Sequence, residues 1–327
     1  MLTVVTGASG FVGSAVCREL LRRNTHVRAA ARRRPDNVGN AEWVSSPDLA
    51  VSEDWTEVLR GSDVIVHAAA RVHVMRDKSA DPLEAFRRAN TEGTLELARQ
   101  AVTAGVSRFV FVSSIKVNGE QTEPGRVFEA DETPRPTDPY GISKLEAEAG
   151  LRRLAARTGL ELVIVRPPLV YGPRVQANFL GMMRWLVRGV PLPLGAVSNR
   201  RSLVALDNLV DLLCICCVHP DAANQTFLVS DGEDVSTTEL LRKLGRALEH
   251  PARLVPVPPM MLEVAGALVG RRDLGQRLCA SLQVDIGKTR SMLGWEPVVT
   301  MEKALKETAR QFLADSNRCS GYRSAGS

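Results

Sequence analysis

The chain has 327 residues, of which 44% are hydrophobic and 24% are charged. This length predicts about two domains of ordinary size, and the composition excludes a chain that is disordered over most of its length. The formal net charge is +5, but much of the basic excess lies within residues 18–34, which favours a phosphorylated small molecule over nucleic acid as the partner.

No apolar run reaches the roughly 18 residues that a membrane-spanning helix needs. The chain opens directly on a strand-like run, without the basic and apolar segments of a secretion signal, and we therefore expect a cytoplasmic protein. Three of the six cysteines, Cys214, Cys216 and Cys217, lie on one apolar stretch. They are interpreted as free thiols packed in the core, and no metal site is predicted.

Short apolar runs alternate with longer amphipathic stretches, which is typical of βαβ units and a parallel sheet. Strands are predicted, in chain order, at residues 2–6, 26–31, 64–67, 109–112, 162–165 and 226–230. Helices are predicted between them, at residues 11–23, 54–59, 82–103, 139–156 and 207–218. The expected fold class is α/β, a Rossmann-type doubly wound parallel sheet with a smaller, interleaved C-terminal substrate domain.

Proline and glycine interrupt the regular pattern after Arg166, and the second region is expected to begin there. We predict a dinucleotide-binding domain at residues 1–166, to which residues 201–230 return. The substrate domain is predicted to combine residues 167–200 and 231–315.

Two local signals lie near the end of the chain. Ser236 and Glu239 have the spacing of a capping box, which predicts that a helix begins there. Residues 316–327 are polar and small, and they are predicted to form a frayed, flexible tail.

A glycine-rich loop joins the first predicted strand to the first helix. Glycines at positions 7, 10 and 13 allow a sharp turn and a close approach to a pyrophosphate, while the helix N-terminus offers free N–H groups to the anion. The loop predicts dinucleotide binding, with contacts from Gly7, Gly10, Phe11, Val12 and Gly13.

The second predicted strand ends beside three consecutive arginines. NAD-binding sites usually present a carboxylate to the ribose at this point, whereas the 2′-phosphate of NADP calls for arginine. Arg32 and Arg33 therefore favour NADP(H), with NAD(H) as the alternative, and a solvated basic turn remains the other interpretation. Asp48 and Leu49 are expected to contact the adenine.

Tyr140 and Lys144 are spaced i to i+4, so they share one face of a predicted helix whose N-cap is Asp138. A cationic lysine one turn away is expected to lower the tyrosine pKa toward a useful range for acid–base chemistry. Ser114, at the end of a strand, can hydrogen-bond a substrate oxygen. Small residues after another strand, Ala68 and Ala69 among them, leave room for a cofactor.

In these motifs the chain resembles the extended short-chain dehydrogenase/reductases that act on nucleotide sugars. The resemblance rests on the glycine loop, residues 67–70, Asn90, Ser114, Tyr140 with Lys144, residues 166–167, 171–173 and 201–207, and residues 293–297.

The resemblance implies a role for each matched residue. Tyr140 would be the acid/base, Lys144 would contact the cofactor ribose and activate the tyrosine, and Ser114 would orient the substrate. It also implies a UDP-sugar substrate and a set of further contacts. The cofactor would be contacted by Pro167, and the substrate by Asn178, Phe179, Arg201 and Arg277.

Two departures from the family narrow the expected reaction. Dehydratases carry Thr-Asp-Glu where this chain has residues 114–116 as Ser-Ile-Lys, so dehydration is not expected. The arginines at the cofactor ribose favour NADPH-dependent reduction over epimerisation. Residues 113–121, 166–173 and 199–211 resemble bacterial O-antigen enzymes, and this resemblance implies reduction at C4 of a UDP-4-keto-6-deoxy-N-acetylhexosamine. The alternative is an NAD-dependent UDP-hexose 4-epimerase, and a more remote one is a non-catalytic NADP-sensing protein. A homodimer is expected by family analogy.

Overall fold

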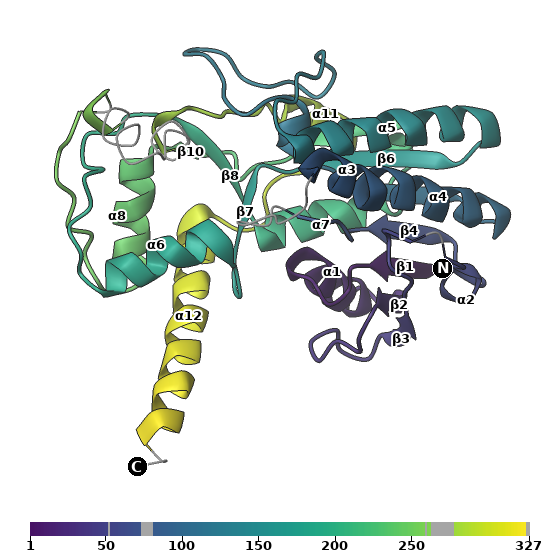
Figure 1. Cartoon of the computed structure of the whole chain (residues 1–327), viewed down its shortest axis with the longest axis horizontal. Helices are drawn as coiled ribbons and strands as arrows, with labels where there is room; N and C mark the ends of the chain where they lie inside the picture. The colour runs from purple at the N-terminus through teal and green to yellow at the C-terminus, as the bar shows by residue number, and fades with distance from the viewer. Residues whose placement is uncertain (52, 73–80, 259, 263–277, 325–327) are drawn as a thin grey trace.

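The computed structural model describes residues 1–51, 53–72, 81–258, 260–262 and 278–324 (Figure 1). Its centre is a seven-stranded sheet with the order β3-β2-β1-β4-β5-β6-β9, in which every neighbouring pair is parallel. The strands are β1 (Leu2–Thr6), β2 (His26–Ala31), β3 (Glu42–Ser45), β4 (Val64–His67), β5 (Arg108–Val112), β6 (Glu161–Arg166) and β9 (Gln225–Leu228). The predicted doubly wound α/β fold is confirmed.

Helices cover both faces of this sheet (Figure 1). On one face, α1 (Phe11–Arg22) packs against α7 (Leu206–Cys216). On the other face, α4 (Gly93–Thr103) packs against α5 (Pro139–Thr158). Each face has its own apolar core: Leu20 and Leu213 belong to the first, Leu97 and Leu151 to the second.

The segment predicted as one helix over residues 82–103 consists of three pieces. It comprises α3 (Pro82–Phe86), a π-helical stretch η1 (Arg87–Glu92), and then α4. Short helical elements complete this part of the chain, namely α2 (Thr56–Leu59) and the 3-10 turns η2 (Ile115–Val117) and η3 (Pro220–Ala222).

The second region is built around a three-stranded sheet with the order β10-β8-β7. Its strands are β7 (Leu169–Tyr171), β8 (Arg201–Ala205) and β10 (Asp234–Val235). Its helices are α6 (Ala177–Val187), α8 (Thr237–Ala247) and α12 (Met301–Ser324), whereas α11 (Gly287–Leu293) packs against β9 of the large sheet. A separate apolar core, which includes Phe179, Leu241 and Leu305, fills the space between these elements.

Within residues 201–230, α7 packs against α1 and β9 pairs with β6 of the large sheet. β8 pairs instead with β7 and β10 in the small sheet. The capping box at Ser236 and Glu239 is confirmed, since each side chain accepts the other residue's backbone N–H. The frayed tail predicted from residue 316 differs from the structure, in which α12 continues through Ser324. Residues 301–324 contain no proline that would interrupt the helix.

The described ranges were predicted to hold neither a membrane-spanning helix nor a metal site. Within them no helix is long and apolar enough to cross a membrane. The same residues contain no group of three histidine, cysteine or acidic side chains arranged to hold a metal ion. The clustered cysteines at positions 214, 216 and 217 are buried and free, as predicted.

Candidate active site

The glycine loop lies at the carboxyl end of β1, pressed against the end of β4. Gly7 has a φ of +68°, and a Cβ atom there would lie 2.8 Å from the Cα of Ala69. A Cβ atom on Gly13 would lie 2.3 Å from the carbonyl oxygen of Gly7. The structure thus brings the predicted loop glycines together with Ala68 and Ala69, and glycine is required for this packing.

The first turn of α1 follows this loop directly and carries no acidic side chain that would occupy its free N–H groups. Gly10 is the N-cap and supplies no side-chain hydrogen bond, and the first turn contains no acidic residue. The N–H groups of Phe11, Val12 and Gly13 are therefore not capped by a side chain, and they lie at the positive end of the helix dipole. This arrangement fits the diphosphate of a dinucleotide.

The arginines after β2 line a cavity of about 750 Å³ beside the same loop. Arg32 and Arg33 both belong to its lining, as does Ser9 of the glycine loop. Arg32 donates to the carboxylate of Asp48 at 3.2 Å, so Asp48 is an acidic neighbour of this arginine. The structure brings these predicted cofactor residues to one place, while the predicted adenine contacts of Asp48 and Leu49 stay predictions.

Tyr140 occupies the first turn of α5. The carboxylate of Asp138 accepts the N–H of Gly141 at 2.6 Å, which confirms the predicted N-cap. The tyrosine ring is half-buried and makes an edge contact with Phe86, with ring centroids 5.9 Å apart. Burial, followed by the nearby Asp138 charge, raises the pKa of Tyr140 to about 12. The expected lowering of the Tyr140 pKa by Lys144 is therefore not found.

Lys144 is buried one turn further along α5, and its Nζ atom lies 4.0 Å from the centroid of the Phe111 ring. Burial lowers the pKa of Lys144 to about 7, against an opposing effect of Glu148. A buried ammonium over an aromatic face is a poorly solvated cation, which favours its interaction with a polar ligand.

His67 at the end of β4 is fully buried and belongs to the supporting structure. Its ring nitrogens lie 2.7 Å from the hydroxyl of Thr6 and 3.0 Å from that of Thr94. Burial, followed by the charge of Lys144, lowers the pKa of His67 to about 3. The imidazole is therefore neutral at physiological pH and does not add a charge to the site.

The two serines after β5 have different partners. Ser113 donates to the buried carboxylate of Glu148 at 2.6 Å. Ser114 is half-buried and caps η2 by accepting the N–H of Lys116 at 3.3 Å. Within the described residues the Ser114 hydroxyl donates to no acceptor, so its hydrogen is available to a ligand. Pro167 accepts the N–H of Ile115 at 3.0 Å, which fixes this turn against the end of β6.

Asn90 and Glu148 are two supporting residues whose roles were not predicted. Asn90 lies in the π-helical stretch, accepts the backbone N–H of Arg71 at 2.7 Å, and donates to the hydroxyl of Ser143 at 3.1 Å. Glu148 follows Lys144 by four residues and binds Arg166 at the end of β6. Its spacing of i+4 from the lysine is the signal that could have identified it.

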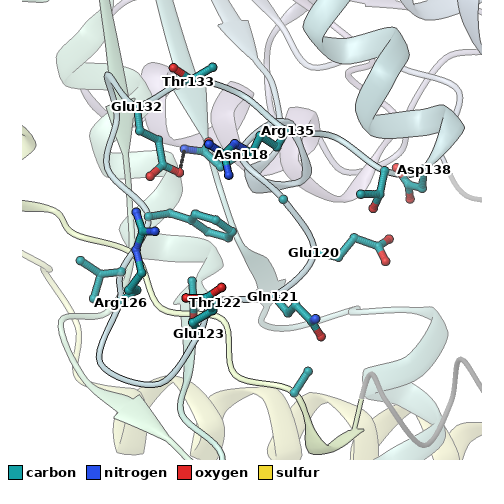
Figure 2. A pocket seen from close by; sticks show the side chains of 15 residues that line it. Asn118, Glu120, Gln121, Thr122, Glu123, Arg126, Glu132, Thr133, Arg135 and Asp138 are labelled. Atoms are coloured by element: carbon teal, nitrogen blue, oxygen red, sulfur yellow. Dashed lines mark hydrogen bonds between the residues drawn. The ribbon is translucent and has the colours of Figure 1, made fainter.

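A second cavity, of about 680 Å³, lies next to the start of α5 (Figure 2). Its lining comes mostly from residues 118–138, together with Ala280. Figure 2 shows acidic and basic side chains on its walls, with Asn118 bonded to Glu132 at 3.0 Å. Arg201 donates to the carbonyl of Ala280 at 3.2 Å, so this predicted substrate residue lies beside the cavity.

The remaining predicted substrate residues are not brought together by the structure. Asn178 is exposed in the first turn of α6. Phe179 is buried and stacks on Tyr171, with ring centroids 5.5 Å apart, so its ring is part of the core. Arg277 lies outside the described residues.

Residues 3–230 match the model of the NAD dependent epimerase/dehydratase family. The chain is 46% identical to a UDP-glucose 4-epimerase of Vibrio cholerae over 316 residues, which is 96% of each chain. It is 27% identical to a 2-alkyl-3-oxoalkanoate reductase of Stenotrophomonas maltophilia, covering 94% of this chain and 98% of the relative.

Among solved structures, the fold resembles that of UDP-glucose 4-epimerase from Thermotoga maritima, crystallised with UDP-glucose. The TM-score is 0.79 at 24% identity, and the match covers 97% of this chain and 100% of the other. The family match covers most of the chain, and the glycine loop, Tyr140, Lys144 and Ser114 lie within it. The protein therefore belongs to the NAD dependent epimerase/dehydratase family, within the extended short-chain dehydrogenase/reductases.

Proposed function

We propose that the protein is a UDP-hexose 4-epimerase that works with a nicotinamide dinucleotide. The observation that carries this proposal is the 46% identity, over 96% of both chains, to the Vibrio cholerae UDP-glucose 4-epimerase. This identity favours 4-epimerisation, which was the alternative expectation, over the NADPH-dependent reduction that the arginines suggested. The glycine cradle at Gly7 and Gly13 and the uncapped start of α1 support the cofactor.

A bound nicotinamide would supply the hydride acceptor that oxidation of a sugar alcohol at C4 needs. Tyr140 would take the proton of the C4 hydroxyl while the hydride leaves C4. After the keto sugar turns, the hydride would return to the opposite face of C4, and Tyr140 would return the proton to the C4 oxygen. Ser114 would donate its hydroxyl hydrogen to the C4 oxygen. Lys144, as a buried cation one turn from Tyr140, would stabilise the phenolate, because its positive charge offsets the negative charge that develops there.

The substrate would lie near the start of α5. The 680 Å³ cavity begins at Asp138, two residues from Tyr140, and its polar lining suits a sugar. Arg201 beside Ala280 would contact the diphosphate of the UDP group, for which a guanidinium offers paired hydrogen bonds.

A second candidate is NADPH-dependent reduction at C4 of a UDP-4-keto-6-deoxy-N-acetylhexosamine. The arginine-lined cavity beside the glycine loop favours it, because a reductase consumes NADPH and must exchange it with the cellular pool. A reductase is also found among the relatives at 27% identity.

One experiment separates the two reactions. Purified protein is incubated with UDP-glucose, and separately with UDP-N-acetylglucosamine, plus catalytic NAD⁺ or NADP⁺, and the C4 epimers are measured by NMR. A parallel reaction contains NADPH and UDP-2-acetamido-2,6-dideoxy-4-hexulose, and nicotinamide absorbance is followed. Epimer formation without net change in the cofactor supports the proposal, whereas stoichiometric NADPH consumption alone supports the reductase. Turnover of neither substrate would contradict both and favour a non-catalytic binding protein.

A further inference from the structure

The cavity beside the glycine loop has one wall that sequence reasoning did not anticipate. Arg174 lines it together with Ser9 and the arginines that follow β2. Arg174 comes from the segment between β7 and α6, about 140 residues later in the chain. Two distant segments therefore contribute guanidinium groups to one hollow.

The charge of this cavity is strongly unbalanced. Four arginines and one aspartate line it: Arg32, Arg33, Arg34, Arg174 and Asp36. Arg32 has Asp48 as its partner, but in the part of the chain that the structure describes, the other three arginines have no hydrogen-bond or ion-pair partner. All four arginines are exposed, and an anion bound among them would offset their mutual repulsion and accept hydrogen bonds from their guanidinium groups.

Arg174 lies in the turn between β7 and α6. Its φ of +70° is unusual for a residue other than glycine, and it follows directly on the Gly172-Pro173 turn after β7. Arg18 of α1 lies near enough that the Arg174 charge helps to lower its pKa, after the larger effect of burial. Arg18 in turn donates to the carbonyl of Asn37, another lining residue, at 2.8 Å.

The position of the cavity indicates which phosphate it takes. The uncapped N–H groups of α1 suit the diphosphate of a dinucleotide, as described above. The arginines at the end of β2 instead lie where the adenosine ribose is bound in this type of fold. An additional phosphate monoester on that ribose would carry nearly two negative charges and would offset the excess of arginine.

We propose that Arg174 is a specificity-determining residue for the cofactor, which closes the site of the 2′-phosphate of NADP(H) from the side of the second region. This inference rests on the proposed use of a nicotinamide dinucleotide, and it holds for either of the two reactions. Arg33 and Arg34 hold the same phosphate from the side of the large sheet.

The test measures binding without turnover. Adenosine 2′,5′-bisphosphate and adenosine 5′-monophosphate are titrated calorimetrically into the wild type, Arg174→Ala and Arg157→Ala. Arg157 is an exposed arginine near the end of α5, on the opposite edge of the sheet, and it serves as the matched control. We expect the wild type to bind the bisphosphate more tightly than the monophosphate. Arg174→Ala should lower the affinity for the bisphosphate about 10- to 100-fold and change the affinity for the monophosphate by less than about two-fold.

Three outcomes would overturn the proposal. The first is equal affinity of the wild type for both nucleotides. The second is an unchanged bisphosphate affinity in Arg174→Ala. The third is an equal loss of affinity for both nucleotides in Arg174→Ala, with an unchanged melting temperature. Arg174→Lys, which keeps the charge but loses the paired donors, should fall between wild type and Arg174→Ala. Selective bisphosphate binding without any epimer formation would refute the epimerase function while leaving the role of Arg174 intact.

Discussion

Glu148 accepts two hydrogen bonds from Arg166, from Nε at 2.9 Å and from Nη2 at 2.6 Å, and both side chains are almost fully buried. Arg166 also donates to Asn118 at 3.0 Å, a residue that lines the cavity of Figure 2. The pair therefore joins the helix that carries Tyr140 and Lys144 to both the central sheet and the cavity wall.

Glu148→Gln should destabilise the protein by about 3–5 kcal/mol, because it leaves the Arg166 charge buried without a counter-charge. Glu146→Gln is the matched control on the same helix, since Glu146 and its partner Arg87 are both partly exposed; it should cost less than about 1 kcal/mol. Urea unfolding of both variants measures the difference. A similar loss of unfolding free energy in the two variants would show that the buried pair stabilises the protein no more than the exposed pair does.

Tyr140→Phe should reduce kcat by about 10²- to 10⁴-fold, because the proton donor is lost while the ring keeps its contact with Phe86. Cofactor affinity should be nearly unchanged. Tyr171→Phe is the control: its hydroxyl donates to Asp231 at 2.7 Å within the second region, so that variant should lose stability but keep turnover. Wild-type rates in Tyr140→Phe would remove this residue from the mechanism.

Gly13→Ala should damage the cofactor site, since the new Cβ would lie 2.3 Å from a backbone oxygen of the same loop. We expect at least about a 100-fold loss of dinucleotide affinity, because the loop must open to admit the methyl group. Gly181→Ala, also within a helix, meets nothing within 4 Å and should stabilise the protein by up to about 1 kcal/mol. Fluorescence titration and thermal melting give the two readouts.

His67 should make the protein sensitive to acid. Its pKa is near 3 in the folded protein, against about 6.5 when unfolded. Between these values only the unfolded chain takes up the proton, so stability falls as pH decreases from about 6.5, by about 1.4 kcal/mol per pH unit. His67→Asn should lose less stability than wild type between pH 7.5 and 5.5, whereas the exposed His250→Asn should follow wild type. Parallel pH profiles for all three proteins would contradict this prediction.

The sequence predicts helix α5, which carries Tyr140 and Lys144, because the signals for this helix are local. Asp138 before Pro139 marks the helix start, and the spacing of Tyr140 and Lys144 then follows from the helical repeat. The glycine loop is recognised for a similar reason, since its three glycines lie between a strand and a helix. Such features depend on neighbours in the chain rather than on distant packing.

Features that depend on distant packing are not predicted. β3 (Glu42–Ser45) is a mostly exposed edge strand without a clear alternation of apolar and polar residues. The raised pKa of Tyr140 arises from burial and from Asp138, whereas the sequence argument considered only Lys144. Arg174 joins the arginines after β2 only because the fold returns the chain to the glycine loop.

The pairing of β6 with β9 has a consequence for how the chain is made. β6 ends at Arg166, but its outer neighbour begins at Gln225. During synthesis the edge of β6 therefore stays open until the first two segments of the small sheet, β7 and β8, have emerged from the ribosome. In a chain that stops before residue 225, the edge of β6 that normally pairs with β9 would be exposed and unpaired. Such an edge favours association between copies of the chain. The large sheet of this protein cannot be completed before β7, α6 and β8 of the second region have been translated.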